Sequence, residues 1–176
     1  MALTTVLPEV PDAFNILEEM KVYLYKETDA FANPNSPTRP EINAGVDLTA
    51  QVAGISGFSV STAMIDAPNL ANKFTPQIGG AVTAEASTMT FNLSKTGADI
   101  RAHLNADESG VTGPEATRGW LLLADAGDVA GSLADLWPVL VTSESKPRDM
   151  GAVSQVTFTF AITGRPRANV ALPATA

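Results

Sequence analysis

The sequence predicts a mainly β protein, an antiparallel β-sandwich or barrel with one short flanking helix. Apolar and polar residues alternate in several segments, which is typical of strands that bury one face. Turns rich in glycine and proline separate these segments, and helical spacing of apolar residues is confined to short stretches. The 176 residues are close to the size of one ordinary domain and can bury a core without disulfides or a metal.

The clearest strand is expected at 154–163. In SQVTFTFAIT, valine, phenylalanine and isoleucine alternate with glutamine and threonine. This period of two assigns Phe158 and Phe160 to the core and leaves the threonines on the other face.

Further strands are expected along the rest of the chain. Segments 57–65 and 82–93 could pair as a long hairpin, with Phe58, Val60 and Met64 on one half-buried face. The other expected strands are 20–25, 119–125 and 135–144.

Helix is expected over only a small part of the chain. Residues 98–105 predict one short helix, because Ile100 and Leu104 are one helical turn apart. A second helical turn could be lined by Val129, Leu133 and Leu136.

The chain divides into an arm, a domain and a tail. Residues 1–19 contain two prolines and four acids and are expected to be an N-terminal arm. Residues 20–167 form the expected domain, and 168–176 a C-terminal tail. Residues 27–45 contain three residues followed by proline and predict a loop too long for a simple connector.

The composition excludes several classes of function. Eleven lysines and arginines against nineteen acids give a formal charge of -8, which disfavours nucleic-acid binding and attachment to acidic membranes. The absence of cysteine excludes disulfides, thiolate metal sites and a cysteine nucleophile. No segment is apolar and long enough to span a bilayer, and the N-terminus does not read as a signal peptide, so we expect synthesis in the cytoplasm.

No motif predicts an enzyme, and no cofactor or metal is expected. His103, the single histidine, is interpreted as an ordinary surface or partly buried residue rather than part of a triad. Residues 105–110 resemble the first half of a calcium loop, but Ala116 stands where the bidentate glutamate is needed. Residues 54–57 fall one glycine short of a nucleophile elbow.

Several segments together resemble a known family. The entry EINAGVDL, the turn GISG before a threonine- and serine-rich strand, LWPVLV and the final VTFTFAITGRP lie within residues 20–167. In these diffuse motifs the chain resembles the major tail tube proteins of long-tailed bacteriophages. The stretch from Ala124 to Asp135 is longer than the resemblance leads us to expect.

The resemblance implies a structural virion protein. Its β-sandwich subunits would form hexameric rings, the inner sheets would join into one continuous β-barrel, and the rings would stack into a tube through which DNA passes without specific binding. The implied partners are further copies of the chain and the tail terminator, tape measure and tail tip proteins. The implied location is the virion tail, after synthesis in the host cytoplasm.

The resemblance also suggests which residues face the channel and the next ring. An acidic wall of small polar side chains would suit DNA passage, because lysine and arginine would hold phosphates. The channel wall candidates are Ser59, Ser61, Glu85, Ser87, Thr88 and Thr90. The candidates for contact between rings are Phe31, Asn33, Asn35 and Arg39.

Two other classes of protein remain open at this point. Tube proteins of contractile injection or secretion systems share the implied architecture. A carbohydrate-binding β-sandwich would also be acidic and β-rich, although only 6% of the residues are aromatic. A hydrolase is the least favoured alternative.

Overall fold

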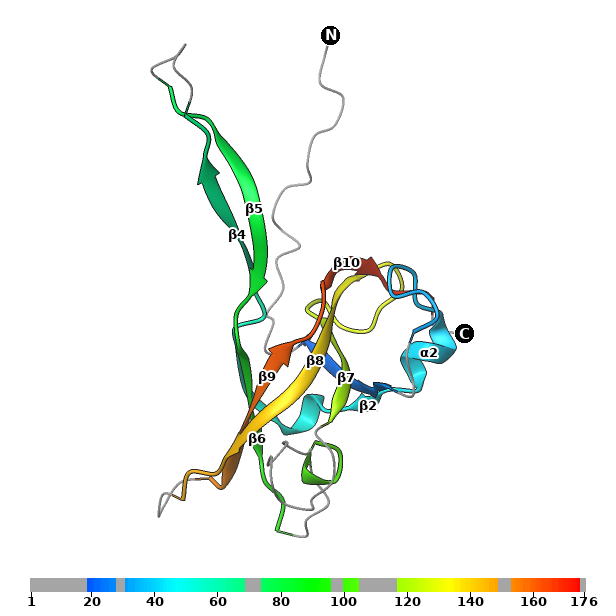
Figure 1. Cartoon of the computed structure of the whole chain (residues 1–176). Helices are drawn as coiled ribbons and strands as arrows, with labels where there is room; N and C mark the ends of the chain where they lie inside the picture. Colours follow the sequence, from blue (N-terminus) through cyan, green and yellow to red (C-terminus); the bar gives the residue numbers. More distant parts are fainter. Residues whose placement is uncertain are drawn as a thin grey trace.

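The computed structural model describes residues 19–27, 31–68, 74–95, 100–104, 117–148 and 153–174. These residues form strands, one short α-helix and two 3-10 helices, so the predicted mainly β class is confirmed (Figure 1). The strands are β1 (Lys21–Lys26), β2 (Val46–Asp47), β3 (Val52–Ser56), β4 (Val60–Asp66), β5 (Gln77–Ala84), β6 (Ser87–Asn92), β7 (Arg118–Ala124), β8 (Leu133–Ser145), β9 (Gln155–Ile162) and β10 (Arg167–Ala171). The helices are α2 (Arg39–Asn43), η3 (Thr49–Gln51) and η4 (Ile100–Ala102).

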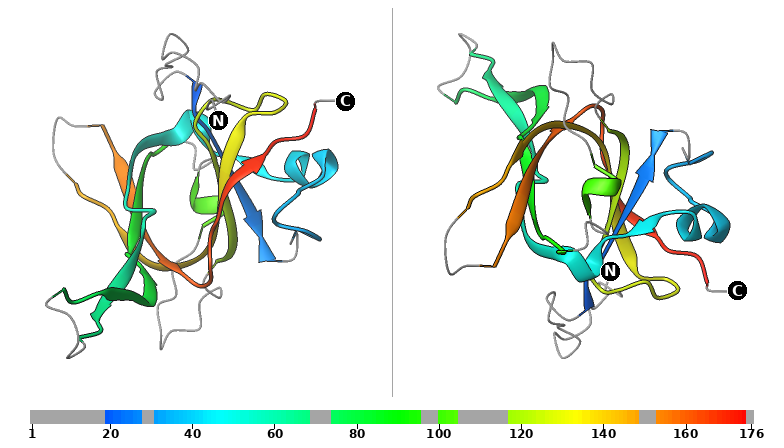
Figure 2. Two further views of the ribbon diagram at one scale, coloured as in Figure 1. Left: turned by 90° about the horizontal axis from the view of Figure 1, so that it is seen from above. Right: turned by 90° about the horizontal axis from the view of Figure 1, so that it is seen from below.

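Eight strands form one antiparallel sheet that curls around its own core. The strand order is β2-β1-β7-β8-β9-β6-β3, and β10 also pairs with β8. The long strand β8 holds β7 along one side and both β10 and β9 along the other. Strands β2 and β3 are the two edges of the sheet, yet only residues 48–51 separate them in the chain. The sheet must therefore curl until its two edges lie close together, and Figure 2 shows the strands arranged around an interior.

The inside of the curled sheet is the main apolar core. Phe158 and Phe160 on β9 are fully buried, which confirms the face assigned from the sequence. Neighbouring strands contribute their own alternate residues to the same cluster. Its other members include Val22, Leu24, Met89, Phe91, Leu121, Leu123, Trp137, Val139, Val141 and Val156.

A second apolar cluster lies on the outer face of β1, β7 and β8. Tyr25 and Leu122 point outward there, because they alternate with residues that point into the core. The chain from Phe31 to α2 covers them, and the Tyr25 hydroxyl donates a hydrogen bond of 3.0 Å to the Ile42 carbonyl oxygen. The predicted loop 27–45 therefore contains a short helix, and part of it belongs to the core.

One candidate for contact between rings is corrected by this cluster. The Phe31 side chain is only 6% exposed, and its ring packs edge-on against Tyr25 at 4.7 Å and Trp120 at 6.3 Å between centroids. Because the ring is buried against these two residues, it offers a neighbouring copy little surface.

Three predicted boundaries also change. Residues 167–171, mostly in the predicted tail, form β10 and pair with β8. The helix predicted at 98–105 is limited, in its described residues, to the 3-10 helix η4. Residues 125–132 contain turns instead of a helix, because β8 already begins at Leu133. The predicted N-terminal arm, 1–19, lies outside the described residues except for Glu19.

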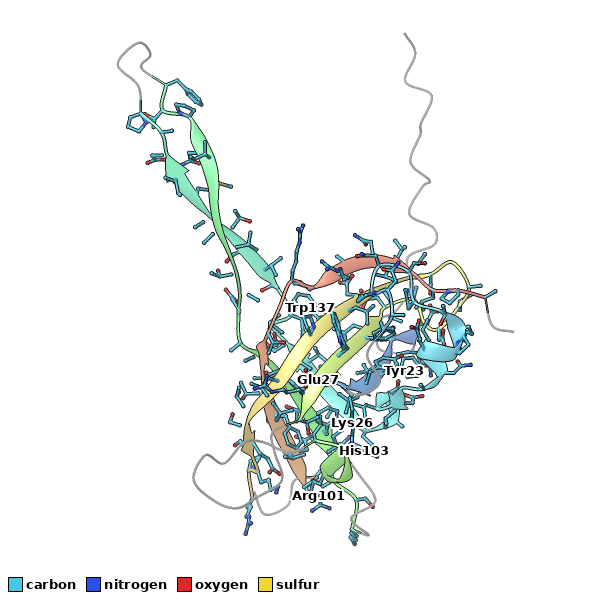
Figure 3. The ribbon with its side chains drawn as sticks, turned by 45° about the vertical axis from the view of Figure 1, so that its right-hand side comes forward. Tyr23, Lys26, Glu27, Arg101, His103 and Trp137 are labelled. Atoms are coloured by element: carbon cyan, nitrogen blue, oxygen red, sulfur yellow. The ribbon has the colours of Figure 1, made fainter. Side chains whose placement is uncertain are left out.

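Strands β4 and β5 form a separate two-stranded sheet that projects away from the body (Figure 1). From here on, "the arm" means this β4–β5 hairpin and not the predicted N-terminal arm. The hairpin predicted from 57–65 and 82–93 is only partly right, because β4 pairs with Gln77–Ala84, whereas Ser87–Asn92 forms β6 and pairs with β3 and β9. The expected half-buried face is wrong for the single chain, because Val60 is 48% and Met64 is 65% exposed. The arm reaches beyond the core, and no described residue of the body covers its outer part (Figure 3).

Candidate functional site

The outer face of β6 and β9 is built from paired polar side chains. Residues directly opposite each other on antiparallel strands share a face, and the register pairs Thr88 with Thr159 and Thr90 with Thr157. The hydroxyls of Thr90 and Thr157 are hydrogen-bonded at 2.9 Å. At the end of the row, Gln155 donates from its Nε2 to the Oδ1 of Asn92 at 3.0 Å.

The same rows extend onto the strands on either side. Ser56 on β3 lies opposite Thr88, and Ser143 on β8 lies opposite Thr159. We call this surface the threonine face. Its residues are Gly54, Ser56, Thr88, Thr90, Asn92, Ser143, Ser145, Gln155, Thr157 and Thr159, none of which is ionisable.

Two acids, Glu41 and Asp128, lie in or against α2, which is on the other side of the molecule from β6 and β9 in Figure 1. Arg39 donates two hydrogen bonds of 2.5 Å to the carboxylate of Asp128, and these hydrogen bonds hold the Asp128 pKa below its ordinary value. The Tyr23 hydroxyl also donates to Asp128 at 3.3 Å, and burial with the nearby carboxylate raises the Tyr23 pKa to about 12 (Figure 3). Burial and the nearby Asp135 raise the pKa of Asp125.

The ion pair of Arg39 with Asp128 predicts a pH-dependent stability. Because the folded pKa of Asp128 lies below its ordinary value of 3.8, the pair stabilises the fold above about pH 4 and is lost as the pH falls further. We expect Asp128→Asn to lower the free energy of unfolding by about 1 to 3 kcal/mol near neutral pH. Urea unfolding between pH 3 and 7 should show the difference from wild type shrinking on acidification, and a constant difference would contradict the assignment.

The junction between the arm and the body is fixed by a buried serine. Gly57 and Phe58 have positive φ values of 88° and 54°, which turn the chain out of β3. The Phe58 N–H donates to the Ser87 hydroxyl oxygen at 2.7 Å, and that hydroxyl donates to the Glu85 carbonyl at 3.3 Å. The Phe58 ring packs against Trp137 at 5.5 Å between centroids, which anchors the arm to the core (Figure 3).

We expect Ser87→Ala to destabilise the subunit by about 1 to 3 kcal/mol, because it leaves the Phe58 N–H without its acceptor. Ser61→Ala is the matched control, since Ser61 is exposed on the arm. Chemical denaturation measures both variants. Equal stabilities for the two would show that the serine does not hold the junction.

The predicted wall residues fall in three places. Thr88 and Thr90 lie on the threonine face, while Ser59, Ser61 and Glu85 are exposed on the arm or at its junction. The prediction for Ser87 is corrected, because its side chain is fully buried. Ser87 alternates along β6 with the outward-facing threonines and so points to the same side as the buried Met89 and Phe91. Thr157 and Thr159 share the threonine face with Thr88 and Thr90 but were not among the candidates, although their alternation with the core phenylalanines was the available signal.

Three predicted ring-contact residues lie in or beside α2. Asn33 and Asn35 are exposed, and a hydrogen bond of 3.1 Å from the Asn35 N–H to the Asn33 side chain fixes the turn between them. Arg39 is already paired with Asp128, and the two side chains are 12% and 14% exposed.

The structure describes only some of the residues considered for other chemistry. His103 is half-buried beside η4, and its carbonyl accepts a hydrogen bond from Thr117. The calcium-like loop 105–110 lies outside the described residues. Across the described ranges, no group of three or more histidines and acids could hold a metal ion, and no helix is long and apolar enough to cross a membrane.

A family model for phage tail tube proteins matches residues 11–175. The chain belongs to the phage tail tube protein family. This tail tube protein is a structural component of a viral tail, as the sequence motifs predicted. No curated protein sequence matches the chain significantly.

Solved structures share the fold of this tail tube protein at low sequence identity. A sheath/tube terminator of the extracellular contractile injection system PVC in its extended state is 10% identical, with a TM-score of 0.56 over 94% of this chain and 97% of that one. A chain from the PVC sheath-tube complex in the extended state is 11% identical, with a TM-score of 0.55 over 85% of this chain and 88% of that one. A chain from the tail of an empty gene transfer agent particle, refined with C6 symmetry, is 11% identical, with a TM-score of 0.52 over 86% and 96%.

Proposed function

We propose that this tail tube protein forms hexameric rings that stack into a tube, with the threonine face lining the channel through which DNA passes. The observation that carries the proposal is the contrast between two outer surfaces of one sheet. The outer face of β1 and β7 is covered by α2 and the chain before it, whereas β6 and β9 present hydrogen-bonded, uncharged polar rows.

The absence of charge from the threonine face suits a passage for DNA. Lysine or arginine would bind phosphates and exchange counterions, and a neutral hydroxyl and amide surface does neither. This revises the expected acidic wall, because no residue of the threonine face is ionisable. In the proposed wall Thr88 and Thr90 are joined by Thr157 and Thr159.

The sheet also offers edges through which copies can join. Within the described residues, β3 pairs only with β6 in the main sheet, and residues 142–145 of β8 pair only with β9. Three antiparallel steps separate β3 from β8, so the two run in opposite directions. We propose that β3 of one copy pairs with this end of β8 in the next, which removes both open edges.

Ring closure through these edges gives a wide barrel. Each copy contributes β3, β6, β9 and the end of β8, so a hexamer contains about 24 strands. Barrels of roughly 16 to 18 strands already leave an aqueous channel. A heterologous contact of this kind closes a ring, while contacts between ring faces repeat along a tube.

The remaining proposals concern partners and location. The tube would be capped by terminator and tip proteins, would surround a tape measure protein, and would be made in the host cytoplasm before entering the virion. The role is structural and not enzymatic. A second candidate is a tube of a contractile injection system, which the fold shared with the PVC structures favours.

Cysteine labelling tests the channel face, because the natural chain has no cysteine. We expect Thr157→Cys to react with a bulky maleimide polymer in dissociated subunits and to be protected in assembled tubes. Asn43→Cys, on exposed α2, is the control and should react in both states. Equal labelling of the two variants in tubes would contradict a channel position for the threonine face.

A further inference from the structure

Strand β10 lies at an edge of the main sheet. It pairs with β8 along one side, and within the described residues no strand pairs with its other side. Val170 and Leu172 are buried in the outer apolar cluster, so packing holds this edge in place. A fixed edge strand can pair with a strand of another chain through its free N–H and C=O groups.

A β-bulge interrupts β10 in its middle. The register with β8 shifts between Arg167 and Val170, so that residues 168 and 169 together lie opposite Asp135. Asn169 has a positive φ of 57°, which asparagine tolerates better than most residues. Its N–H donates a hydrogen bond of 2.9 Å to the Oδ1 of Asp135.

The bulge removes a donor that an incoming strand would need. Alternate residues of an antiparallel strand direct their N–H and C=O groups to the same side. Leu172 bonds through both groups to residues 131 and 132, so positions 169, 171 and 173 face away from β8. The Asn169 N–H is bonded to Asp135, and Pro173 has no N–H. Only Ala171 therefore offers a free donor along this edge.

The other edges of the main sheet differ from β10. Strand β2 has two residues and is too short to pair extensively with another chain. The edges that the proposed ring joins, 52–56 on β3 and 142–145 on β8, contain no proline. Strand β10 thus combines a bulge with a proline directly after its last buried residue, Leu172.

We propose that Asn169 and Asp135 close the edge of β10 to strand addition, so that copies of the chain join through β3 and β8 and not through β10. The choice of joining edges rests on the proposed tube, whereas the closed edge is a property of the subunit. If the edge were open, two copies could pair antiparallel around Ala171. Such a dimer would be two-fold symmetric, so every hydrogen bond restored in one copy would occur twice.

A cysteine reporter makes this pairing measurable. The chain has no cysteine, and Ala171 is exposed, so Ala171→Cys provides one thiol on the β10 edge. Two copies that pair antiparallel around this position would bring the thiols close enough for a disulfide. Dilute subunits, below the concentration at which tubes form, are oxidised and followed on a non-reducing gel.

Two pairs of substitutions are compared in the Ala171→Cys background. Asn169→Val disfavours the positive φ, and Asp135→Ala removes the acceptor, so each frees the N–H at position 169. Asn169→Gly keeps the positive φ, and Asp135→Asn keeps a side-chain oxygen that can accept. Thermal melting shows whether each variant is folded, and Asp135→Ala decides the question if Asn169→Val does not fold.

We expect Asn169→Val and Asp135→Ala to form the disulfide dimer at least about tenfold faster than Asn169→Gly and Asp135→Asn, because the restored hydrogen bond counts twice. Ser87→Ala in the same background controls for a general loss of stability and should dimerise no faster than Ala171→Cys alone. Equal rates within the matched pairs would overturn the inference. So would an increase in the Ser87→Ala variant as large as that in Asp135→Ala.

The use of dissociated subunits separates this inference from the proposed function. Wild-type protein that forms no tubes at any concentration would reject the proposed ring, and the cross-linking rates would still decide whether the edge of β10 is closed. Wild-type tubes together with equal cross-linking rates would reject the closed edge and leave the tube in place.

Discussion

We expect Phe158→Ala to lower the free energy of unfolding by about 3 to 5 kcal/mol, the usual cost of removing a buried phenylalanine ring. Phe158 is fully buried, and its ring meets Phe91 edge-on at 6.0 Å between centroids. Truncation would leave a cavity between β9 and β6 at the centre of the core. Denaturant unfolding of the dissociated subunit measures the loss.

Thr159→Ala is the control for this substitution. Thr159 is the next residue on β9, is half-buried on the threonine face and lies outside the apolar core. We expect its unfolding free energy to change by about 1 kcal/mol or less. Similar losses for both variants would mean that the two faces of β9 are not divided between core and channel.

The second large effect concerns DNA. We expect Thr157→Lys to convert a neutral channel into one that holds DNA, because every copy in a ring adds one positive charge at the same level. Tubes of this variant should protect DNA fragments from nuclease at low salt and release them as salt increases. Wild-type tubes should protect none.

Asn43→Lys separates the channel from the outside of the tube. It adds the same charge on exposed α2, so any DNA that it attracts should stay open to nuclease. Protection in both lysine variants, or in neither, would remove Thr157 from the channel wall.

The strands in which apolar and polar residues alternate regularly could be predicted from the sequence. Strand β9 was predicted almost residue for residue, because phenylalanine and threonine alternate without interruption and the two faces meet different surroundings. The same reasoning identified Thr88 and Thr90. It did not name Thr157, because the polar rows of β6 and β9 form one surface only when the two strands are paired, and the pairing is not visible in the sequence.

Other features depend on contacts that no local pattern records. The alternation of Val60 and Met64 predicts burial but cannot tell whether the covering surface belongs to the same chain, and in the subunit both are exposed. Phe31 lies within a segment of loop composition, yet its ring is buried edge-on against Tyr25. Strand β10 is short and irregularly paired, so it was predicted as tail.

The most direct test of the account is a helical cryo-EM reconstruction of assembled wild-type tubes. The account predicts a ring in which β3 of each copy pairs antiparallel with residues 142–145 of its neighbour, and in which Thr88, Thr90, Thr157 and Thr159 line the lumen. A map that places α2 at the lumen and the threonine face on the outer surface would contradict it.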